Sequence, residues 1–271
     1  MHYLQEEYFK MITSKKNPRI QFIRSLLQDR KTREESGLFL LEGVRIVNDA
    51  MANHAQILEV FFSRDLSDRG MRLVEKLTQE GIAVDEVEEW VFKSLMETSN
   101  SQGIAAICRI PETKFPENLD FVILADQLRD PGNMGTLMRT AASAGAQAVL
   151  ATPGSVDLFS PKVVRSAMGA HFHIVCKEME WDQIRQLLYT KTSPALTVYN
   201  AAADGAKNFR DCDFTLPTLL IIGSEADGAS ETAANLTNYK ISVPMHGNFE
   251  SLNAAVAAGI IIFEIVRQRT K

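Results

Sequence analysis

The chain has 271 residues, 45% of them hydrophobic, and a formal net charge of −5. The hydrophobic content supports a packed core in one large domain or two ordinary domains and argues against global disorder. The negative charge argues against a protein that coats nucleic acid along its whole surface, but a local basic patch is compatible with it.

The first basic patch lies near the N-terminus, where residues 10–33 carry eight lysines or arginines and one acid, Asp29. Asn17 and Pro18 predict the start of a helix, and apolar residues follow at helical spacing. Two interpretations of the basic remainder are open: a solvated helix surface, or a face that contacts RNA phosphates. The candidate phosphate contacts are Lys15, Lys16, Arg19, Arg24, Arg30, Lys31 and Arg33.

Strands and helices then alternate, which is typical of a layered α/β domain. We expect strands at residues 38–41, 57–62, 83–87 and 104–108, and helices at 44–52, 71–79 and 89–96. We therefore expect a smaller α/β domain over residues 1–110, followed by a linker over residues 111–118 that is polar and contains two prolines.

A second α/β domain is expected over residues 119–271. Residues 121–125 are continuously apolar, as in a parallel sheet covered on both faces. Further strands are expected at 148–151, 173–176, 196–199, 218–222 and 240–243, and helices at 136–145, 161–168 and 251–269. The sequence contains neither a dinucleotide-binding fingerprint nor a phosphate-binding P-loop, which argues against a nucleotide-cofactor oxidoreductase.

Three segments of this second domain follow directly after expected strands. Residues 130–135 read DPGNMG and precede Arg139, residues 223–228 read GSEADG, and residues 243–253 read VPMHGNFESLN. Ligands of parallel α/β sheets bind beyond the carboxyl ends of the strands. We therefore expect the three segments to converge on one pocket.

Each segment also has a plainer interpretation. Asn133 and Gly135 are expected at a turn that leads into a helix, where backbone amides attract anions and Arg139 can bind a phosphate. Glu225 leaves a buried strand end, so we expect it to pair with Arg139, although a first-turn acid of a helix would look the same. Ser251 is the expected cap of the last helix.

The last helix starts with small residues, and residues 260–263 are large and apolar. Such a helix is expected to be buried, either in the core or at a subunit interface. Its longest apolar run, residues 254–263, is shorter than the roughly 20 residues that a membrane span needs. No membrane segment is therefore expected. Residues 1–7 are acidic and lack a hydrophobic core, so a signal peptide is not expected either.

Metal and disulfide chemistry have little support in the sequence. Cys108, Cys176 and Cys212 are far apart and form no C-x-x-C pair, and His171 and His173 have no partner ligands at metal spacing. We therefore expect no metal site, free thiols and a reducing, cytoplasmic location.

Together and in this order, the three segments resemble the motifs of the SpoU (TrmH-type) RNA ribose 2′-O-methyltransferases. The resemblance covers roughly residues 121–267, and residues 17–20 and 37–43 resemble the substrate-binding domain that many members carry. It implies a C-terminal SPOUT-type α/β methyltransferase domain with a trefoil knot, preceded by a smaller α/β RNA-binding domain. It also implies a homodimer with the final helix at its interface.

The resemblance further implies S-adenosylmethionine as the methyl donor, bound at Gly223, Val243 and Leu252. The matching catalytic positions are Asn133, Arg139, Glu225, Ser251 and Asn253. The sequence departs from the family at Val243, where Ile is frequent, and at Ala254-Ala255, where members often have Val-Ser. Neither departure removes an expected catalytic group.

The implied reaction is a single displacement in which a ribose 2′-hydroxyl takes the methyl group. Family accounts assign proton removal to the arginine, here Arg139, but a guanidinium is essentially always protonated, so an RNA phosphate oriented by Arg139 is the alternative. The two-domain layout favours ribosomal RNA as the substrate. Transfer RNA is the alternative substrate. A less favoured alternative for the function of the protein is an RNA-binding factor without catalysis.

Overall fold

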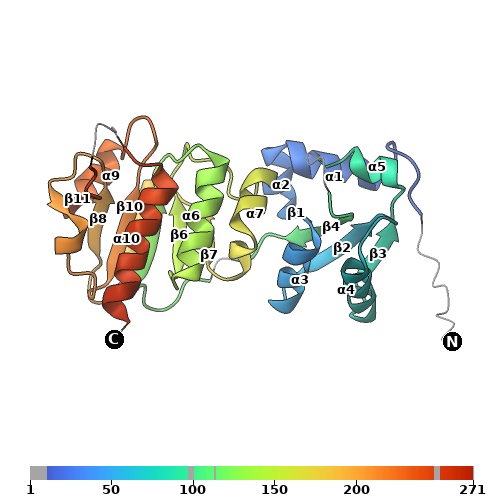
Figure 1. Cartoon of the computed structure of the whole chain (residues 1–271), viewed down its shortest axis with the longest axis horizontal. Coiled ribbons are helices and arrows are strands. Elements are labelled where there is room, and N and C mark those ends of the chain that lie inside the picture. The colour runs from blue at the N-terminus through green and yellow to red at the C-terminus, as the bar shows by residue number, and fades with distance from the viewer. Residues whose placement is uncertain (1–10, 97–100, 113, 247–250, 271) are drawn as a thin grey trace. The chain divides into compact units, whose positions relative to one another are not determined.

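The computed structural model describes residues 11–96, 101–112, 114–246 and 251–270. The chain forms two compact units, Met1–Pro111 and Glu112–Lys271, each of which combines one sheet with helices (Figure 1). The alternation of strands and helices in the sequence therefore predicts the class of both units correctly.

The first unit contains a four-stranded sheet in the order β1-β4-β2-β3. Strand β4 pairs antiparallel with β1 and β2, whereas β2 and β3 are parallel. Its elements are α1 (Pro18–Gln28), α2 (Arg30–Ser36), β1 (Leu38–Glu42), α3 (Val44–Ala52), β2 (Ile57–Phe62), α4 (Asp68–Gln79), β3 (Ala83–Glu86), α5 (Glu89–Lys93) and β4 (Ile104–Arg109).

The basic segment at the start of this unit folds into two helices rather than one. Asn17 caps α1 by accepting from the backbone N–H of Arg19, with Pro18 in the first turn as expected. Helix α1 ends where Asp29 adopts an extended conformation and caps α2 through Lys31 N and Thr32 N. The buried face of α1 packs on strand residues such as Leu40 and Phe61.

The second unit contains a seven-stranded sheet in the order β7-β6-β5-β10-β8-β11-β9, in which every neighbouring pair is parallel. Its strands are β5 (Phe121–Ala125), β6 (Ala148–Ala151), β7 (Val175–Glu178), β8 (Thr197–Ala201), β9 (Lys207–Asn208), β10 (Thr218–Ile222) and β11 (Tyr239–Ser242). Its helices are α6 (Pro131–Ser143), α7 (Pro161–Ala167), α8 (Trp181–Lys191), α9 (Glu231–Leu236) and α10 (Ala254–Arg269), with short 3-10 turns at Ala170–Phe172 and Phe209–Asp211.

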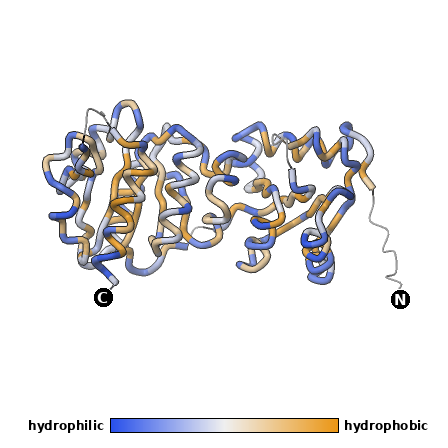
Figure 2. Tube along the Cα trace, viewed as in Figure 1, coloured by the Kyte–Doolittle hydropathy of each residue, from blue (hydrophilic) through white to orange (hydrophobic). Residues whose placement is uncertain are grey.

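Helices cover both faces of this sheet, as the continuously apolar strand at 121–125 predicts. Helices α6, α7 and α10 share one core with alternate residues of β5, β6 and β10, and α8 and α9 share a second core on the opposite face. Figure 2 shows the hydrophobic residues concentrated on these strands and on α10.

Three expected helix starts and one expected strand start differ from the structure by two residues or more. Helix α6 begins at Pro131 rather than 136, because Asp130 caps it by accepting from Asn133 N at 2.7 Å. Helix α10 begins at Ala254 because Asn253, and not Ser251, is its cap. Helix α4 begins three residues before the expected 71, and β7 begins two residues after the expected 173. Helices α2, α8 and α9 had not been expected.

Gly135 lies inside the second turn of α6, at the point where this helix crosses α7. A Cβ atom at this position would lie 2.4 Å from Ser166 Cβ and 2.7 Å from Val163 O, so the glycine lets α6 and α7 cross closely. The glycine that had suggested a turn is therefore a helix-packing residue.

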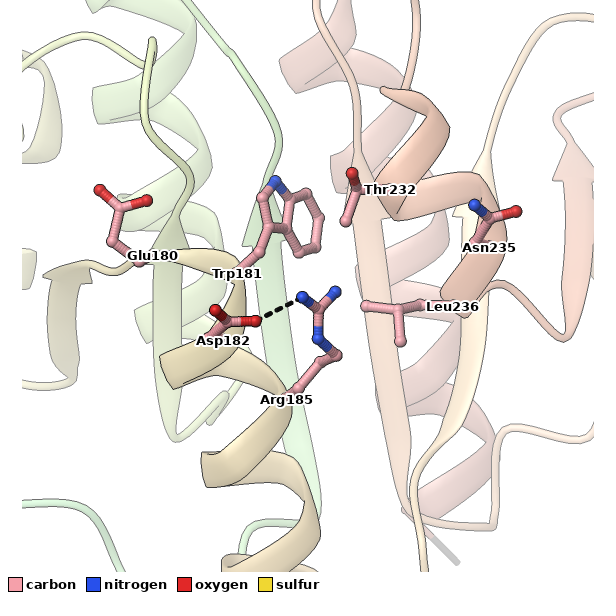
Figure 3. Close-up of a pocket in the computed structure, with 7 residues that line it drawn as sticks. All are labelled: Glu180, Trp181, Asp182, Arg185, Thr232, Asn235 and Leu236. Atoms are coloured by element: carbon pink, nitrogen blue, oxygen red, sulfur yellow. Dashed lines mark hydrogen bonds and ion pairs between the residues drawn. The ribbon is translucent and has the colours of Figure 1, made fainter.

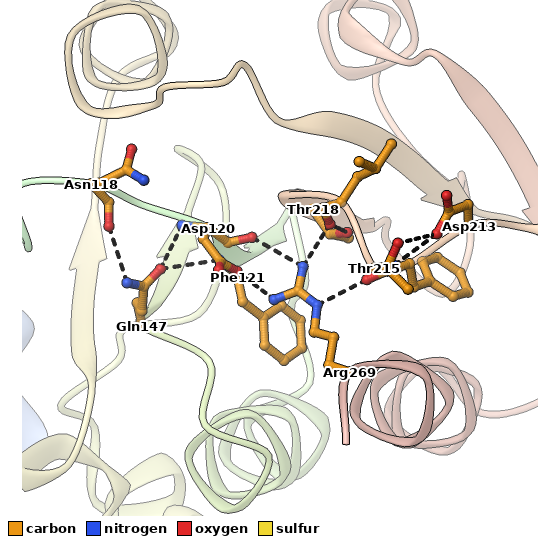
Figure 4. Close-up of polar contacts among 10 residues, drawn as sticks. Asn118, Asp120, Phe121, Gln147, Asp213, Thr215, Thr218 and Arg269 are labelled. Atoms are coloured by element: carbon orange, nitrogen blue, oxygen red, sulfur yellow. Dashed lines mark hydrogen bonds and ion pairs between the residues drawn. The ribbon is translucent and has the colours of Figure 1, made fainter. Parts of the chain in front are cut away.

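Arg269 holds the C-terminal end of α10 against the segments that lead into β5 and β10, as Figure 4 shows. Its guanidinium donates to the carbonyl oxygens of Phe214 at 2.9 Å and Leu216 at 2.7 Å and forms an ion pair with Asp120. It also lies over the ring of Phe121, 5.1 Å from the ring centroid. These contacts join the last helix to the beginnings of β5 and β10. Within the described residues, no helix is both long and apolar enough to cross a membrane.

Candidate active site

One cavity of about 680 Å³ lies beyond the carboxyl ends of β8, β10 and β11. Six of the residues proposed for the site line it directly: Gly223, Glu225, Val243, Ser251, Leu252 and Asn253. Residues 201–204, which comprise the last residue of β8 and the three after it, complete the wall together with residues such as Met245, Ala257 and Ile261. The 201–204 segment could not be predicted as part of the site, because it is mostly alanine and carries no recognisable motif.

Asn133 joins the first motif to the other two. Its Nδ2 donates to Glu225 Oε1 at 2.6 Å, and its Oδ1 accepts from Asn253 Nδ2 at 2.9 Å. An amide suits this position because it offers a donor on one side and an acceptor on the other. Asn133 thus links by hydrogen bonds two residues that follow it by 92 and 120 positions in the sequence, and the three segments meet in one hydrogen-bonded chain of side chains.

The expected pair between Glu225 and Arg139 is not formed, because Asn133 is the partner of Glu225. Arg139 lies six residues after Asn133 on α6, which turns it about 120° around the helix at 100° per residue. Its side chain is exposed, does not line the cavity, and makes no hydrogen bond or ion pair in the part of the chain that is described.

The loop after β10 folds back on itself, so that its first and last residues lie close together. Ser224 and Gly228 exchange backbone hydrogen bonds of 2.9 and 3.0 Å, and Gly228 has φ +70°. A Cβ atom on Gly223 would lie 2.3 Å from both Gly228 C and Ala229 N. Only glycine therefore fits at position 223 without displacement of the loop.

The cavity fits S-adenosylmethionine in size and in charge. Its volume lies within the range of small-molecule sites, about 300–1,000 Å³. Apolar side chains from β10, β11 and α10 offer a surface for an adenine ring. Asp204, Glu225 and Asp227 are among its lining residues, whereas no lysine or arginine is found in the described lining. An acidic cavity favours the cationic sulfonium and disfavours an RNA phosphate.

A second hollow lies between α8 and α9, on the face of the sheet that α6, α7 and α10 do not cover (Figure 3). It contains none of the motif residues. It is lined by Trp181, Arg185 and Asn235, among others, and Arg185 donates to Asp182 on the same helix at 2.6 Å. We therefore place the candidate active site at the first cavity.

The basic residues proposed for RNA contact differ in their accessibility. Lys16, Arg30 and Lys31 are exposed, although Arg30 and Lys31 form ion pairs one turn along α2, with Glu34 and Glu35. Lys15 lies over the ring of Trp90, with Nζ 5.3 Å from the centroid, and Arg24 is half-buried.

Two arginines of this basic set bind groups of the first unit itself. Arg33 is 5% exposed, and its guanidinium donates to the carbonyl oxygens of Leu26 and Leu27 at the end of α1. The expectation that Arg33 contacts RNA is therefore wrong, because the side chain is buried. Arg19 is half-buried and forms ion pairs with Glu59 and Asp85.

None of the described histidines and cysteines lines the cavity. Among the described residues, no group of three or more His, Cys, Asp or Glu side chains is placed to hold a metal ion. Burial lowers the pKa of His171 to about 4 and raises the pKa of Cys176 to about 12, which keeps both side chains neutral.

Comparison with known proteins agrees with this geometry. The model of the SpoU rRNA Methylase family matches residues 120–263, and the model of the MRM3-like substrate binding domain matches residues 17–106. The 23S rRNA (guanosine(2553)-2′-O)-methyltransferase RlmP of Bacillus subtilis is 32% identical over 94% of this chain and 99% of its own. The 23S rRNA (uridine(2479)-2′-O)-methyltransferase of Streptomyces viridochromogenes is 31% identical over 96% of this chain and 93% of its own.

Solved structures show the same fold with the donor bound. The SpoU methyltransferase AviRb from Streptomyces viridochromogenes, in complex with AdoMet (S-adenosylmethionine), has a TM-score of 0.84 at 29% identity, covering 93% of this chain and 99% of its own. The AdoMet-bound rRNA methyltransferase from Sinorhizobium meliloti has a TM-score of 0.85 at 28% identity, covering 97% of this chain and 99% of its own.

The fold and the cavity thus define the class of this protein as an RNA 2′-O-ribose methyltransferase that uses S-adenosylmethionine. The chain belongs to the SpoU rRNA methylase family, and its first unit is an MRM3-like substrate-binding domain. The expectations for family, fold class, enzyme class and methyl donor are confirmed.

Proposed function

We propose that this protein methylates a ribose 2′-hydroxyl of ribosomal RNA at the cavity beyond β8, β10 and β11. The observation that carries the proposal is the hydrogen-bonded chain from Glu225 through Asn133 to Asn253, which brings the three motifs to the edge of a cavity that fits the donor. The naming of the relatives as 23S rRNA 2′-O-methyltransferases supports ribosomal RNA as the substrate.

We assign the donor to the wall formed by Gly223, Val243 and Leu252, where S-adenosylmethionine supplies a methyl group already activated by the sulfonium. The chain then has to orient the ribose and remove its proton. Asn133, Glu225 and Asn253 form a fixed polar edge that can hold the sugar hydroxyls, and Ser251 lies in the same lining. Arg139 is exposed and can bind an RNA phosphate, which is the group we propose as the proton acceptor.

We propose that the first unit binds the RNA through the exposed part of its basic segment, in particular Lys16, and through the half-buried Arg24. The match to a substrate-binding domain supports this assignment. Binding of this kind releases counterions and weakens as the salt concentration rises.

We also propose a homodimer, in which α10 lies at the interface. Val256, Ile260 and Phe263 are 51%, 38% and 52% exposed and recur at i, i+4 and i+7 on one face of α10. A second copy of this chain that covered the stripe would bury apolar area now in contact with water. The family resemblance adds a C-terminal trefoil knot and a cytoplasmic location to the proposal.

Mapping of ribose methylation tests the substrate. Ribosomal RNA from a strain without this gene should lack one or more 2′-O-methyl groups, and the purified protein with S-adenosylmethionine should restore them. Arg139→Ala should lose transfer while its donor affinity, measured by calorimetry, stays within about twofold, because Arg139 lies outside the cavity lining. An unchanged methylation map, with loss of methyl groups from transfer RNA instead, would reject ribosomal RNA as the substrate.

The oligomeric state tests the interface. Sedimentation should show a dimer for the wild type and a monomer for Phe263→Lys, because burial of a charge in an apolar interface is costly. Tyr189→Lys is a matched control, because Tyr189 is an 89% exposed aromatic residue on α8, away from the stripe. A Phe263→Lys variant that remains a dimer would place the interface elsewhere.

A further inference from the structure

Asp126 is a buried carboxylate directly after β5, between the first and second motifs in space. It has no exposed surface, although it stands at the same edge of the sheet as the cavity. It is not part of the cavity lining, so it does not touch the donor. A buried carboxylate is costly unless hydrogen bonds satisfy it, so its contacts indicate what keeps it there.

Those contacts reach both ends of the loop after β10. The backbone N–H of Asp126 donates to Ile222 O at 2.8 Å, where the loop begins. Its Oδ2 accepts from Ser230 N at 2.6 Å, where the loop ends and α9 starts. One residue therefore holds the two ends of the segment that carries Gly223 and Glu225.

The other carboxylate oxygen ties this arrangement to β6. Asp126 Oδ1 accepts from Thr152 Oγ1 at 2.8 Å, and Thr152 Oγ1 accepts in turn from Gln127 N at 3.0 Å. The side chain of Asp126 is thus fixed from two sides by donors that are themselves parts of the sheet edge.

These hydrogen bonds and the backbone segments between them form a closed ring of contacts. From Asp126 the chain runs to Asn133, which donates to Glu225 at 2.6 Å, and the Glu225 loop returns through Ser230 to the Asp126 carboxylate. We infer that Asp126 is a positioning residue, which sets donor affinity by fixing the loop of Gly223 and Glu225 against the segment of Asn133. The inference rests on the proposed binding of the donor in this cavity.

The geometry predicts that shape and hydrogen bonding matter here more than charge. In Asp126→Asn, Oδ1 can still accept from Ser230 N while Nδ2 donates to Thr152 Oγ1, which has a second lone pair for Gln127 N. In Asp126→Ala both bonds vanish and Ser230 N is left without its acceptor. Thr152→Val removes only the hydroxyl and keeps the shape of the side chain.

Calorimetry with S-adenosylmethionine alone measures the effect. Asp126→Ala should weaken donor binding at least about tenfold and Thr152→Val about threefold or more, whereas Asp126→Asn should stay within about threefold of the wild type. The matched control is Thr218→Val, a buried threonine at the other end of β10 whose hydroxyl donates to Leu216 O. It should lower the thermal unfolding midpoint and leave donor affinity unchanged.

The outcomes separate this inference from the proposed function. Donor affinity lost in Asp126→Ala and kept in Asp126→Asn, without a matching loss in Thr218→Val, supports the positioning role. Equal affinity in all variants overturns it and leaves the proposed function intact, whereas a wild type that binds no donor overturns the use of the cavity itself. If Asp126→Ala fails to fold, Thr152→Val decides the question, because normal affinity in that variant also overturns the role.

Discussion

Gly223→Ala is the sharpest test of the cavity, because it adds one methyl group where the backbone leaves no space. The new Cβ would lie 2.3 Å from Gly228 C, 2.3 Å from Ala229 N and 2.5 Å from Gly228 O. Ordinary contact begins near 3.4 Å, so the loop has to move by about 1 Å. These neighbours are backbone atoms, so a change of rotamer cannot relieve the clash.

The expected loss follows from what such a movement breaks. A shift of about 1 Å lengthens the Asn133–Glu225 hydrogen bond from 2.6 Å to about 3.6 Å, at which it no longer counts as a hydrogen bond. Overpacking of this kind costs about 1–3 kcal/mol. If the cost falls on the donor-binding conformation, affinity for S-adenosylmethionine decreases about 5- to 150-fold.

Calorimetry on the variant and on a matched glycine gives the result. Gly259→Ala adds the same methyl group inside α10, where the nearest atom of another described element to its Cβ is Thr140 Cγ2 at 3.8 Å. This control should keep normal donor affinity and gain up to about 1 kcal/mol of stability, because alanine is the better helix former. Normal donor affinity in Gly223→Ala would refute the assignment of this loop to the cavity wall.

Three further predictions concern separate parts of the molecule. Asn133→Asp places a second carboxylate 2.6 Å from that of Glu225, and transfer should fall at least about tenfold in a methylation assay while the fold is retained. Burial lowers the pKa of His171 to about 4, below its usual 6.5, so the unfolded state binds the extra proton. Stability should therefore fall by roughly 3 kcal/mol as the pH drops from 6.5 to 4, and denaturant titrations of His171→Phe should show a flatter dependence. Replacement of both Lys16 and Lys31 by glutamine should weaken RNA binding and reduce its salt slope by about 1–2, and an unchanged slope in filter binding would remove them from the interface.

Much of the fold could be predicted from the sequence where local signals agree with the tertiary structure. Strands β2, β5, β6 and β10 have the expected bounds, because their mostly apolar runs of four to six residues have the length of a buried strand and are too short for an ordinary helix. The starts of α6 and α10 could not be placed, since Asp130 and Asn253 are each one of several polar residues able to cap. Packing selects among such candidates.

The candidate site shows the same division. The three motifs were located from their sequence, since each follows an apolar strand and a parallel sheet brings strand ends to one edge. The partner of Glu225 was mistaken, because a charge pair with Arg139 looks favourable until the helical rotation of α6 turns Arg139 away. Burial of Arg33 was missed for a similar reason, since an arginine can satisfy its donors on the carbonyl oxygens at a helix end.

The sequence by itself determined the class of both units, most of their strands and helices, the position of each motif and, through the motifs, the family and its methyl donor. These are local properties that a few consecutive residues carry. Only the tertiary structure decided that Asn133 joins Glu225 to Asn253, that residues 201–204 complete the cavity and that Asp126 holds both ends of one loop. Such contacts depend on strand order and helix rotation, which the whole packed core fixes and no short segment encodes.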